Sequence, residues 1–458
     1  MSQGMLIVTG ADRIVVDADT ERDGALVIGH EGRVIDPAAS RADPDAPRAD
    51  PAAPTGTGIL DATGCLVTPG LVNAHHHLLQ TGFRTLPGTR GVPMRDWLPA
   101  MAAGYARAGI DADLTGATAS VGLAEALLSG VTTVADHQLN WPERAAADAD
   151  AIADTVAIAR SVQTAAAALG ARLVFVRGSA HDDAQAAAAS AEAIVADLLA
   201  AGHNRGVTAD GMLQIAVGPA GVHSDPEATF RALGEVARRH SLRRRTQANE
   251  QVDTVIALER YGRRPLELLD DWGWLAPDVT IAHLCDVTDA EIALLADRAT
   301  TATHAPGCDV PMGWGIAPVA RLLEAGVAVG LGTSGGGSND AGHLLADARL
   351  AMQISALVGP LLPARTVLGM ATAGGAAGLG RTDIGHLRPG ARGDACVWDV
   401  SGVADAGTAD PVAGLLWAAP GRRPRHVIVG GRIVVRDYRL VTADEHDLVG
   451  ALQARVGR

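Results

Sequence analysis

The sequence predicts an α/β fold, a (β/α)8 TIM-like barrel with a small composite β-sandwich domain that is built by the N- and C-terminal segments together. Length is the first observation, because 458 residues exceed one small core but suit a barrel of about 250 to 350 residues with a minor domain. The second is that apolar strand-like runs alternate with alanine-rich helical runs in the middle of the chain. The third is that both ends hold only short strand-like runs between turn residues.

Residues 1–65 are predicted to form the first part of the sandwich. Their apolar runs are short and are separated by glycine and aspartate turns, as a small sandwich requires. A stretch rich in proline, alanine and aspartate, Ala42–Gly58, has no periodicity and is predicted to be a loop within that domain. The expected strands are Met5–Val8, Arg13–Val16, Ala25–Ile28 and Arg33–Ile35.

Residues 66–380 are predicted to form the barrel. Eight strand candidates occur there, which is the number that closes such a barrel. They are Leu66–Val72, Val131–Asp136, Arg172–Arg177, Leu213–Gly218, Arg243–Ala248, Val279–His283, Thr300–His304 and Val327–Thr333. The intervening segments carry leucine, isoleucine and valine at helical spacing, which favours helices packed on a barrel. Such segments are Leu114–Leu128, Val156–Leu169, Ala184–Leu199 and Glu227–His240.

Residues 381–458 are predicted to complete the sandwich. A last helical region, Arg365–Leu379, precedes them, and β character then returns in Gly390–Val400 and His426–Tyr438. The second of these contains a Gly-Gly turn between two β-branched runs, which predicts a hairpin. The barrel is therefore expected to be one long insertion between the two halves of the sandwich.

Composition excludes several classes of function. The formal net charge is -14 and the one run of three consecutive arginines is Arg243–Arg245, so nucleic acid is a poor candidate partner. No apolar run reaches the roughly 18 residues that span a bilayer. The first residues carry neither a basic region nor an apolar signal segment, so a cytoplasmic protein with no membrane partner is expected.

Cysteine and lysine usage limits the kind of metal site. The four cysteines are far apart and form no Cys-x-x-Cys pair, which argues against a disulfide framework and against a cysteine-type zinc site. Any metal is therefore expected to rely on histidine and oxygen ligands. The chain contains no lysine, which excludes barrel hydrolases that bridge two metals with a carboxylated lysine and leaves a mononuclear site.

The stretch Cys65–Gln80 carries the strongest chemical signal. It begins as an apolar, β-branched run and reaches three consecutive histidines, of which His75 and His77 face the same side of a strand while His76 faces the other. Two imidazoles from one strand end could hold one metal ion, although polar residues at a strand terminus would explain the pattern equally well. Polar residues also end the other candidate strands, where a barrel places its active site: Asp136, His137, Arg177, Gln247, Glu250, His283, His304 and Ser334.

Four segments resemble the amidohydrolase superfamily. They are Pro-Gly-Leu-Val-Asn-Ala-His-His-His at 69–77, Thr-Ile-Ala-His at 280–283, Met-Gly-Trp-Gly-Ile-Ala-Pro at 312–318 and Gly-Ser-Asn-Asp at 337–340. Within that superfamily they resemble the aminohydrolase branch of triazine hydrolases, 8-oxoguanine deaminase and cytosine-type deaminases, over almost the whole chain. The resemblance implies a metal-dependent hydrolase that removes an amino or similar leaving group from a nitrogen heterocycle of the oxopurine, pterin, pyrimidine or s-triazine type.

The same resemblance implies roles for the strand-end residues. One divalent metal ion, expected to be zinc, would be held by His75, His77 and His283. Metal-bound hydroxide would attack the ring carbon, Glu250 would shuttle the proton to the ring nitrogen, and His304 would hold the substrate or the leaving group.

Three further residues are expected to contact the small-molecule substrate. Gln80 and Arg177 match positions that resemble substrate contacts in the oxoguanine-type members. The ring of Trp97 could stack on a flat heterocycle, and core packing is the equal alternative for this residue. A homodimer is expected because relatives commonly pair.

The chain departs from the implied pattern at two ligand positions. Gln247 stands where the family has histidine, and Ser334 stands at the catalytic strand-eight position where the family has aspartate. Gln247 would be a weaker ligand than imidazole, and Ser334 could not act as a base, so Glu250 would take over the whole proton relay. Cys285 is a less favoured replacement ligand. The two departures leave open a second hypothesis, a metal-poor relative that binds a heterocycle or runs a metal-free acid/base reaction with Glu250 and His304.

Overall fold

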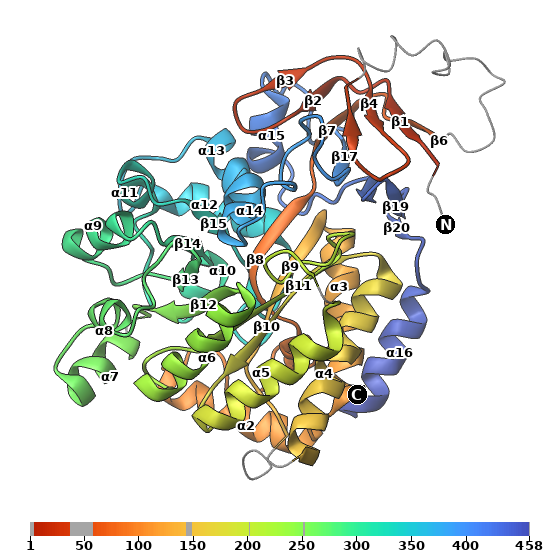
Figure 1. The fold of residues 1–458 in the computed structure, drawn as a ribbon. Helices are drawn as coiled ribbons and strands as arrows, with labels where there is room; N and C mark the ends of the chain where they lie inside the picture. The colour runs from red at the N-terminus through yellow and green to blue at the C-terminus, as the bar shows by residue number, and fades with distance from the viewer. Residues whose placement is uncertain (1–3, 37–57, 143–148, 201, 251, 458) are drawn as a thin grey trace.

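The structure is a computed structural model, and it describes residues 4–36, 58–142, 149–200, 202–250 and 252–457. The chain folds as a barrel with a β-domain at one end (Figure 1). The predicted loop Ala42–Gly58 lies outside the described residues apart from Gly58, the first residue of a strand. Within the described ranges, no helix is both long enough and apolar enough to span a membrane.

The barrel is a closed parallel sheet. Its strand order is β15-β14-β13-β12-β11-β10-β9-β8-β16, and the first and last of these belong to one chain segment. In that segment β15 pairs with β14, and β16 pairs with β8, so the eighth strand position joins the two edges of the sheet. The predicted eight-stranded barrel is therefore confirmed. The strands are β8 (Leu71–His77), β9 (Val131–Gln138), β10 (Arg172–Ser179), β11 (Leu213–Pro219), β12 (Arg243–Ala248), β13 (Val279–His283), β14 (Thr301–His304), β15 (Val329–Leu331) and β16 (Ser334–Gly335).

The first barrel strand differs from the prediction. The run predicted as one strand, Leu66–Val72, is divided between β7 (Cys65–Pro69), which belongs to the sandwich, and β8 in the barrel. Gly70 separates the two strands, and a Cβ atom there would lie 2.2 Å from the Thr132 hydroxyl oxygen. The chain therefore changes sheets at a residue that tolerates close contact. The remaining barrel strands end within two residues of their predicted limits.

Helices cover the outside of the barrel (Figure 1). On β10, Leu173 and Phe175 join the large apolar cluster that the surrounding helices share, whereas Val174 and Val176 join a smaller cluster inside the barrel. The helices are α3 (Ala112–Leu128), α4 (Ala149–Leu169), α5 (Ala184–Leu198), α6 (Glu227–His240), α7 (Val252–Tyr261), α8 (Pro265–Asp271), α9 (Asp289–Asp297), α11 (Val319–Glu324), α12 (Leu344–Ser355) and α13 (Ala364–Gly369). The predicted last helix continues beyond α13 as a π-helical turn, η2 (Met370–Gly374), and α14 (Gly375–Gly378).

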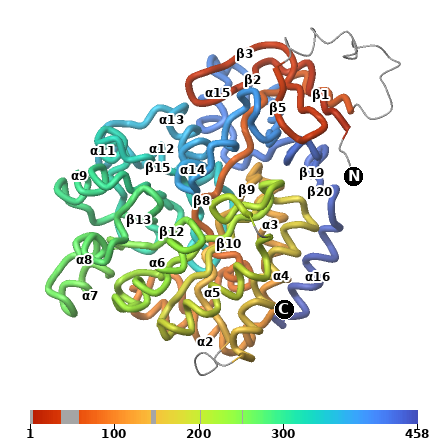
Figure 2. The backbone as a smooth tube through the Cα atoms, in the orientation of Figure 1, coloured from red at the N-terminus to blue at the C-terminus, as the bar shows by residue number. Residues whose placement is uncertain are grey.

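The β-domain combines both ends of the chain, as predicted. In its seven-stranded sheet, β7 pairs with β17 (Ala395–Asp399), and red N-terminal strands lie beside blue C-terminal ones in Figure 2. The predicted hairpin is formed by β18 (His426–Val429) and β19 (Arg432–Arg436) around Gly430 and Gly431. The other strands of this sheet are β2 (Arg13–Val15), β3 (Glu21–Arg22) and β20 (Arg439–Leu440), and a four-stranded sheet holds β1 (Leu6–Thr9), β4 (Leu26–Ile28), β5 (Val34–Ile35) and β6 (Gly58–Asp61). We retain the division into 1–65, 66–380 and 381–458 as a proposal, except that residues 66–69 of β7 pair within the sandwich sheet.

A buried ion pair joins the barrel to the β-domain. Arg172, the first residue of β10, donates from Nε and Nη2 to the two carboxylate oxygens of Asp394 at 2.7 and 2.8 Å. Both side chains are 2% exposed, and Asp394 also accepts a hydrogen bond from the amide of Gly430 in the hairpin turn. Bidentate, charge-assisted contacts of this kind fix orientation as well as distance.

The last helix, α16 (Glu445–Val456), was not predicted. It lies along α3 on the outside of the barrel (Figures 1 and 2), where Arg455 forms an ion pair with Asp111 at 2.7 Å. No residue of α16 is fully buried, and a helix of this kind needs no strong apolar stripe in its sequence. The pattern that predicts a helix is therefore weak here.

Candidate active site

The C-terminal end of β8 places two histidines side by side within the barrel. The ring centroids of His75 and His77 are 4.8 Å apart, and the ring of His75 is 5.2 Å from that of His283 on β13. His77 Nδ1 lies 2.7 Å from the carbonyl oxygen of His137, to which it donates, so its Nε2 lone pair remains available. The structure therefore brings together three imidazoles from two distant parts of the chain.

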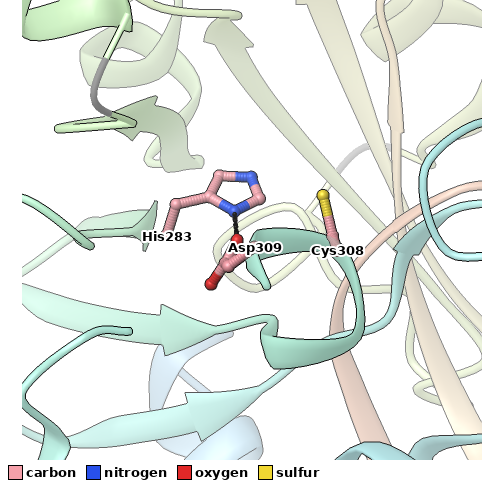
Figure 3. A group of neighbouring side chains, drawn as sticks. All are labelled: His283, Cys308 and Asp309. Atoms are coloured by element: carbon pink, nitrogen blue, oxygen red, sulfur yellow. Dashed lines mark hydrogen bonds and ion pairs between the residues drawn. The ribbon is translucent and has the colours of Figure 1, made fainter. Parts of the chain in front are cut away.

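His283 is held from both sides. Its Nδ1 lies 2.6 Å from a carboxylate oxygen of Asp309, and its Nε2 lies 3.1 Å from the side-chain oxygen of Gln247 and 3.5 Å from Glu250. Asp309 ends α10 (Pro306–Asp309), the short helix directly after β14, and its second carboxylate oxygen is 3.5 Å from Nδ1 of His304. Figure 3 shows the Asp309 carboxylate on one ring nitrogen of His283. Asp309 thus links two of the predicted site histidines and directs the other nitrogen of His283 toward Gln247 and Glu250.

Burial sets the protonation states of the site. It lowers the pKa of His75 well below the usual value and that of His77 to about 4, so both rings are neutral and able to bind a metal. Burial also raises the pKa of Glu250 above the usual range of a carboxyl group. At His283 burial acts to lower the pKa, but the carboxylates of Asp309 and Glu250 raise it overall. Burial opposes ionisation of Asp309 too, yet its contact with His283 brings the Asp309 pKa down to about 2.

Several buried polar atoms at the site have no hydrogen-bond partner among the described residues. They are Nε2 of His75, both carboxylate oxygens of Glu250, Nδ1 of His304 and the second oxygen of Asp309. A buried polar atom without a partner costs about 1–3 kcal/mol, and a bound cation with its water would satisfy such atoms. Imidazole nitrogen and carboxylate oxygen are also ligands that zinc accepts. The residues present therefore fit a divalent metal ion.

Gln247, one of the two departures from the family pattern, faces this centre. The amide nitrogen of Gln247 donates to the carbonyl of Ala220 at 3.3 Å, which turns the amide oxygen toward His283. Ser334 is buried and pairs in register with His76 on β8. The φ values of Ser334 (53°) and His283 (77°) are positive, which costs residues other than glycine roughly 1–3 kcal/mol each and is typical of functional sites.

Gln80 and Trp97 lie beside the segment that follows strand eight. The side-chain oxygen of Gln80 accepts from the Gly337 amide, and the indole nitrogen of Trp97 donates to the Gly337 carbonyl, both at 3.0 Å. The ring of Trp97, on α2 (Met94–Ala108), belongs to an apolar cluster, which matches the core-packing alternative. The other buried members of this cluster are Leu79, Phe83, Leu86, Met101, Tyr105 and Leu114.

Arg177 does not join the histidines. It lies two residues after Phe175 on β10 and faces the helices as Phe175 does, so that its guanidinium donates to Ser190 on α5 at 2.8 Å and to Asp182 at 2.6 Å. The guanidinium also lies over the ring of Trp141, 5.0 Å from the ring centroid. These residues line an open cavity of about 780 Å³ that none of the site histidines lines. Strand alternation, applied from Phe175 onward, is the signal that would have placed Arg177 outside the barrel.

Sequence reasoning missed Asp309 and the role of the His137 carbonyl. Asp309 follows His304 by five residues, in the segment Ala-Pro-Gly-Cys-Asp. A proline there predicts the first turn of a helix, and a carboxylate at the end of such a short helix stays close to the strand that precedes it. Backbone contacts such as that of His137 with His77 leave no mark in the sequence.

Comparison with known proteins adds independent findings. The profile of the amidohydrolase family matches residues 66–434. The chain is 35% identical to an 8-oxoguanine deaminase of Pseudomonas aeruginosa, with 81% of this chain and 82% of that protein covered. It is 34% identical to a 5-methylthioadenosine/S-adenosylhomocysteine deaminase of Halobacterium salinarum, with 85% and 86% covered. Among solved structures it resembles an atrazine chlorohydrolase from Arthrobacter aurescens complexed with zinc, with a TM-score of 0.87, 29% identity, and 98% of this chain and 100% of that chain covered.

Proposed function

The chain belongs to the amidohydrolase family, and from this premise we propose that it is a metal-dependent hydrolase that removes an amino or similar group from a nitrogen heterocycle. One observation carries the proposal. His75 and His283 lie with ring centroids 5.2 Å apart, His77 lies beside them, and the buried carboxylate of Glu250 is 3.5 Å from His283 Nε2. This arrangement provides metal ligands and a proton-transfer group in one water-poor site.

His75, His77 and His283 would hold the ion, with the oxygen of Gln247 at its edge. When bound, a divalent ion such as zinc supplies a Lewis acid that lowers the pKa of a water molecule toward about 7. Zinc is supported by the zinc-complexed structural relative and by the nitrogen-rich ligand set.

Glu250 performs the proton transfers in the proposed reaction. Its carboxylate removes a proton from the attacking water, whose oxygen forms a bond to the ring carbon that bears the leaving group. The same carboxyl then gives this proton to the ring nitrogen. It next takes the remaining proton from the added hydroxyl group and passes it to the leaving nitrogen, so that the bond to the leaving group breaks, the group departs as ammonia or an amine, and a ring carbonyl remains. Burial raises the pKa of Glu250, which suits a group that must both accept and return a proton near neutral pH.

His304 would hold the substrate from the strand-seven side. Its Nδ1 faces Asp309 at 3.5 Å, so the opposite edge of the ring is free to contact a polar atom of the heterocycle. The relatives deaminate 8-oxoguanine and adenosine-type compounds, which supports an oxopurine or aminopurine among the proposed heterocycles, alongside pterin, pyrimidine and s-triazine rings.

A second candidate function is a metal-poor protein that binds a heterocycle, or converts it by acid and base catalysis with Glu250 and His304. Gln247 and Ser334 favour this candidate, because neither supplies a strong charged or imidazole ligand. The convergence of three imidazoles, two of which burial holds neutral, favours the hydrolase.

Metal analysis and an activity screen separate the two. The purified chain is assayed for zinc and then screened for ammonia release from aminated purines, pterins, pyrimidines and triazines, with added zinc or with a chelator. The hydrolase requires about one equivalent of metal and ammonia release that the chelator abolishes. A protein that binds heterocycles but takes up no metal supports the second candidate.

We also propose that the protein acts in the cytoplasm and as a homodimer. Sedimentation of the purified chain tests the second statement, since a single species with the mass of one chain would contradict it.

A further inference from the structure

The proposed ligand set contains no anion. Three imidazoles and the neutral oxygen of Gln247 would leave the double charge of a buried ion to be offset only by the neighbouring carboxylates of Glu250 and Asp309, and an incompletely compensated buried charge is costly. Ser334 provides only a hydroxyl at the strand-eight position. We propose that the thiolate of Cys308 is a ligand of this ion, and that Asp309 positions His283 as its neighbouring ligand. The inference rests on the proposed function, since it concerns the same ion.

Cys308 lies at ligand distance from His283. The ligand atoms of His283, Cys308 and Asp309 all lie within 4.8 Å of one another, and all three residues are buried. Zinc binds sulfur at about 2.3 Å and nitrogen at about 2.0–2.1 Å, so two ligand atoms on one ion are roughly 3.3–4.4 Å apart. Figure 3 shows Cys308 and His283 as neighbouring side chains, with Asp309 in contact with only one nitrogen of the His283 ring. The limit of 4.8 Å lies close to this range, which supports the proposal that both residues bind one ion.

The thiol also lies beside the segment that forms strand eight. It contacts the hydroxyl groups of Ser334 and Ser338, and Ser334 pairs with His76, the residue between His75 and His77. Cys308 would therefore reach the ion from the side of the eighth barrel strand, and His283 would reach it from β13, the sixth. An ion between them would have three nitrogen ligands and one sulfur ligand, a set that zinc accepts in tetrahedral geometry.

Asp309 prepares His283 for this role. The 2.6 Å contact keeps a proton on Nδ1, so Nε2, which faces the oxygen of Gln247 at 3.1 Å, is the nitrogen that would bind the ion, as in many metal-bound histidines with a carboxylate partner. Asp309 and Cys308 are consecutive residues of α10, so one short helix supplies both the ligand and the group that orients its neighbour. The unpaired buried atoms of His75 and Glu250 provide the independent sign that a cation belongs here.

Cys285 is the alternative sulfur donor and provides the control. It follows His283 by two residues and packs near Cys308 against Trp314, but it is partly exposed, whereas Cys308 is 1% exposed. Assignment of the sulfur ligand to Cys308 or to Cys285 therefore predicts different outcomes for the two matched serine variants.

Cobalt substitution tests the proposal on the full chain. Purified protein is stripped of metal and titrated with Co²⁺, and the near-ultraviolet spectrum is recorded for thiolate-to-cobalt charge transfer. We expect this absorption at one equivalent in the unaltered protein, its loss in Cys308→Ser and its retention in Cys285→Ser. Asp309→Asn should keep the absorption but weaken zinc affinity about 10–100-fold, the usual cost of losing the partner of a metal-bound histidine.

Three results would overturn the assignment. Cobalt that binds without thiolate absorption refutes Cys308 as a ligand and leaves the proposed hydrolase intact. Absorption that disappears in Cys285→Ser but persists in Cys308→Ser shows that Cys285, and not Cys308, is the sulfur ligand. Failure of the unaltered chain to bind cobalt or zinc at all refutes this inference together with the proposed function. Because the unaltered protein gives the first reading, the test does not depend on the folding of any variant.

Discussion

Glu250 is the residue on which turnover is expected to depend most directly. Its carboxylate is 1% exposed and makes no hydrogen bond within the described residues, so it is free to exchange protons with water and substrate. Glu250→Gln should reduce kcat about 10²–10⁴-fold, the usual contribution of a positioned acid or base, while zinc content stays near one equivalent. Steady-state kinetics with metal analysis measure both quantities.

Glu267→Gln is the matched control, because this glutamate on α8 is about half exposed and should leave kcat unchanged. An unaltered kcat in Glu250→Gln would contradict the proposal that Glu250 transfers the protons.

Gln247 is expected to limit the affinity of the site for metal. Its side-chain oxygen already points at Nε2 of His283 from 3.1 Å, so a histidine at this position would direct a nitrogen into the same space. Gln247→His should tighten zinc binding at least about tenfold, which corresponds to about 1.4 kcal/mol. Competition with a chromophoric chelator measures this affinity. Gln453→His, an exposed change on α16, adds a histidine without affecting the site.

Single residues were predictable where a strand end fixed them. His75, His77, His283 and Glu250 converge because parallel strands bring their C-terminal ends to one rim. Arg177 stays apart because its position along β10 directs its side chain toward the outside of the barrel. The prediction considered only that Arg177 ends a strand and not which face of the strand it occupies. Asp309 lay beyond prediction because its contact with His283 depends on how α10 turns back after β14.

At the scale of the elements, β11 and β12 leave no room for a side chain at Gly218. A Cβ atom on this residue would lie 1.5 Å from the carbonyl oxygen of Arg245, two residues before Gln247. Gly218→Ala should therefore displace β12 and lower the free energy of unfolding by at least about 1–3 kcal/mol, with weaker metal binding as a result. Urea unfolding measures the first effect. Gly421→Ala, where no atom lies within 4 Å of the added carbon, should change stability little.

The elements were predictable from periodicity where one face is buried. The limits of β13 match the prediction, since its apolar run ends in the polar residue His283 at the rim. The limits of β12 match as well, although its sequence, Arg-Arg-Arg-Thr-Gln-Ala, contains no apolar run. The boundary at Gly70 was not predictable from the apolar run, because β7 and β8 are both fully buried and read as one strand. The helix α16 escaped notice for the opposite reason, since none of its residues is fully buried.

At the scale of the whole molecule, the ion pair between Arg172 and Asp394 is expected to hold the barrel and the β-domain together. Removing one partner leaves a charge buried without compensation, so Arg172→Met should lower the free energy of unfolding by about 3–5 kcal/mol. Arg160→Met is the control, because the pair of Arg160 with Asp197 is largely exposed and contributes at most about 1 kcal/mol. Equal stability of the two variants in urea would contradict the role of the buried pair.

The composite sheet imposes an order on biosynthesis. Trp398 on β17 donates a hydrogen bond to Thr68 on β7, which precedes it by 330 residues. A ribosome adds roughly 5–20 residues per second, so β7 waits on the order of 20–60 seconds for its neighbour. During that interval the barrel strands can assemble, but the edge of β7 stays open to other nascent chains, and molecular chaperones have their main opportunity to act on this protein.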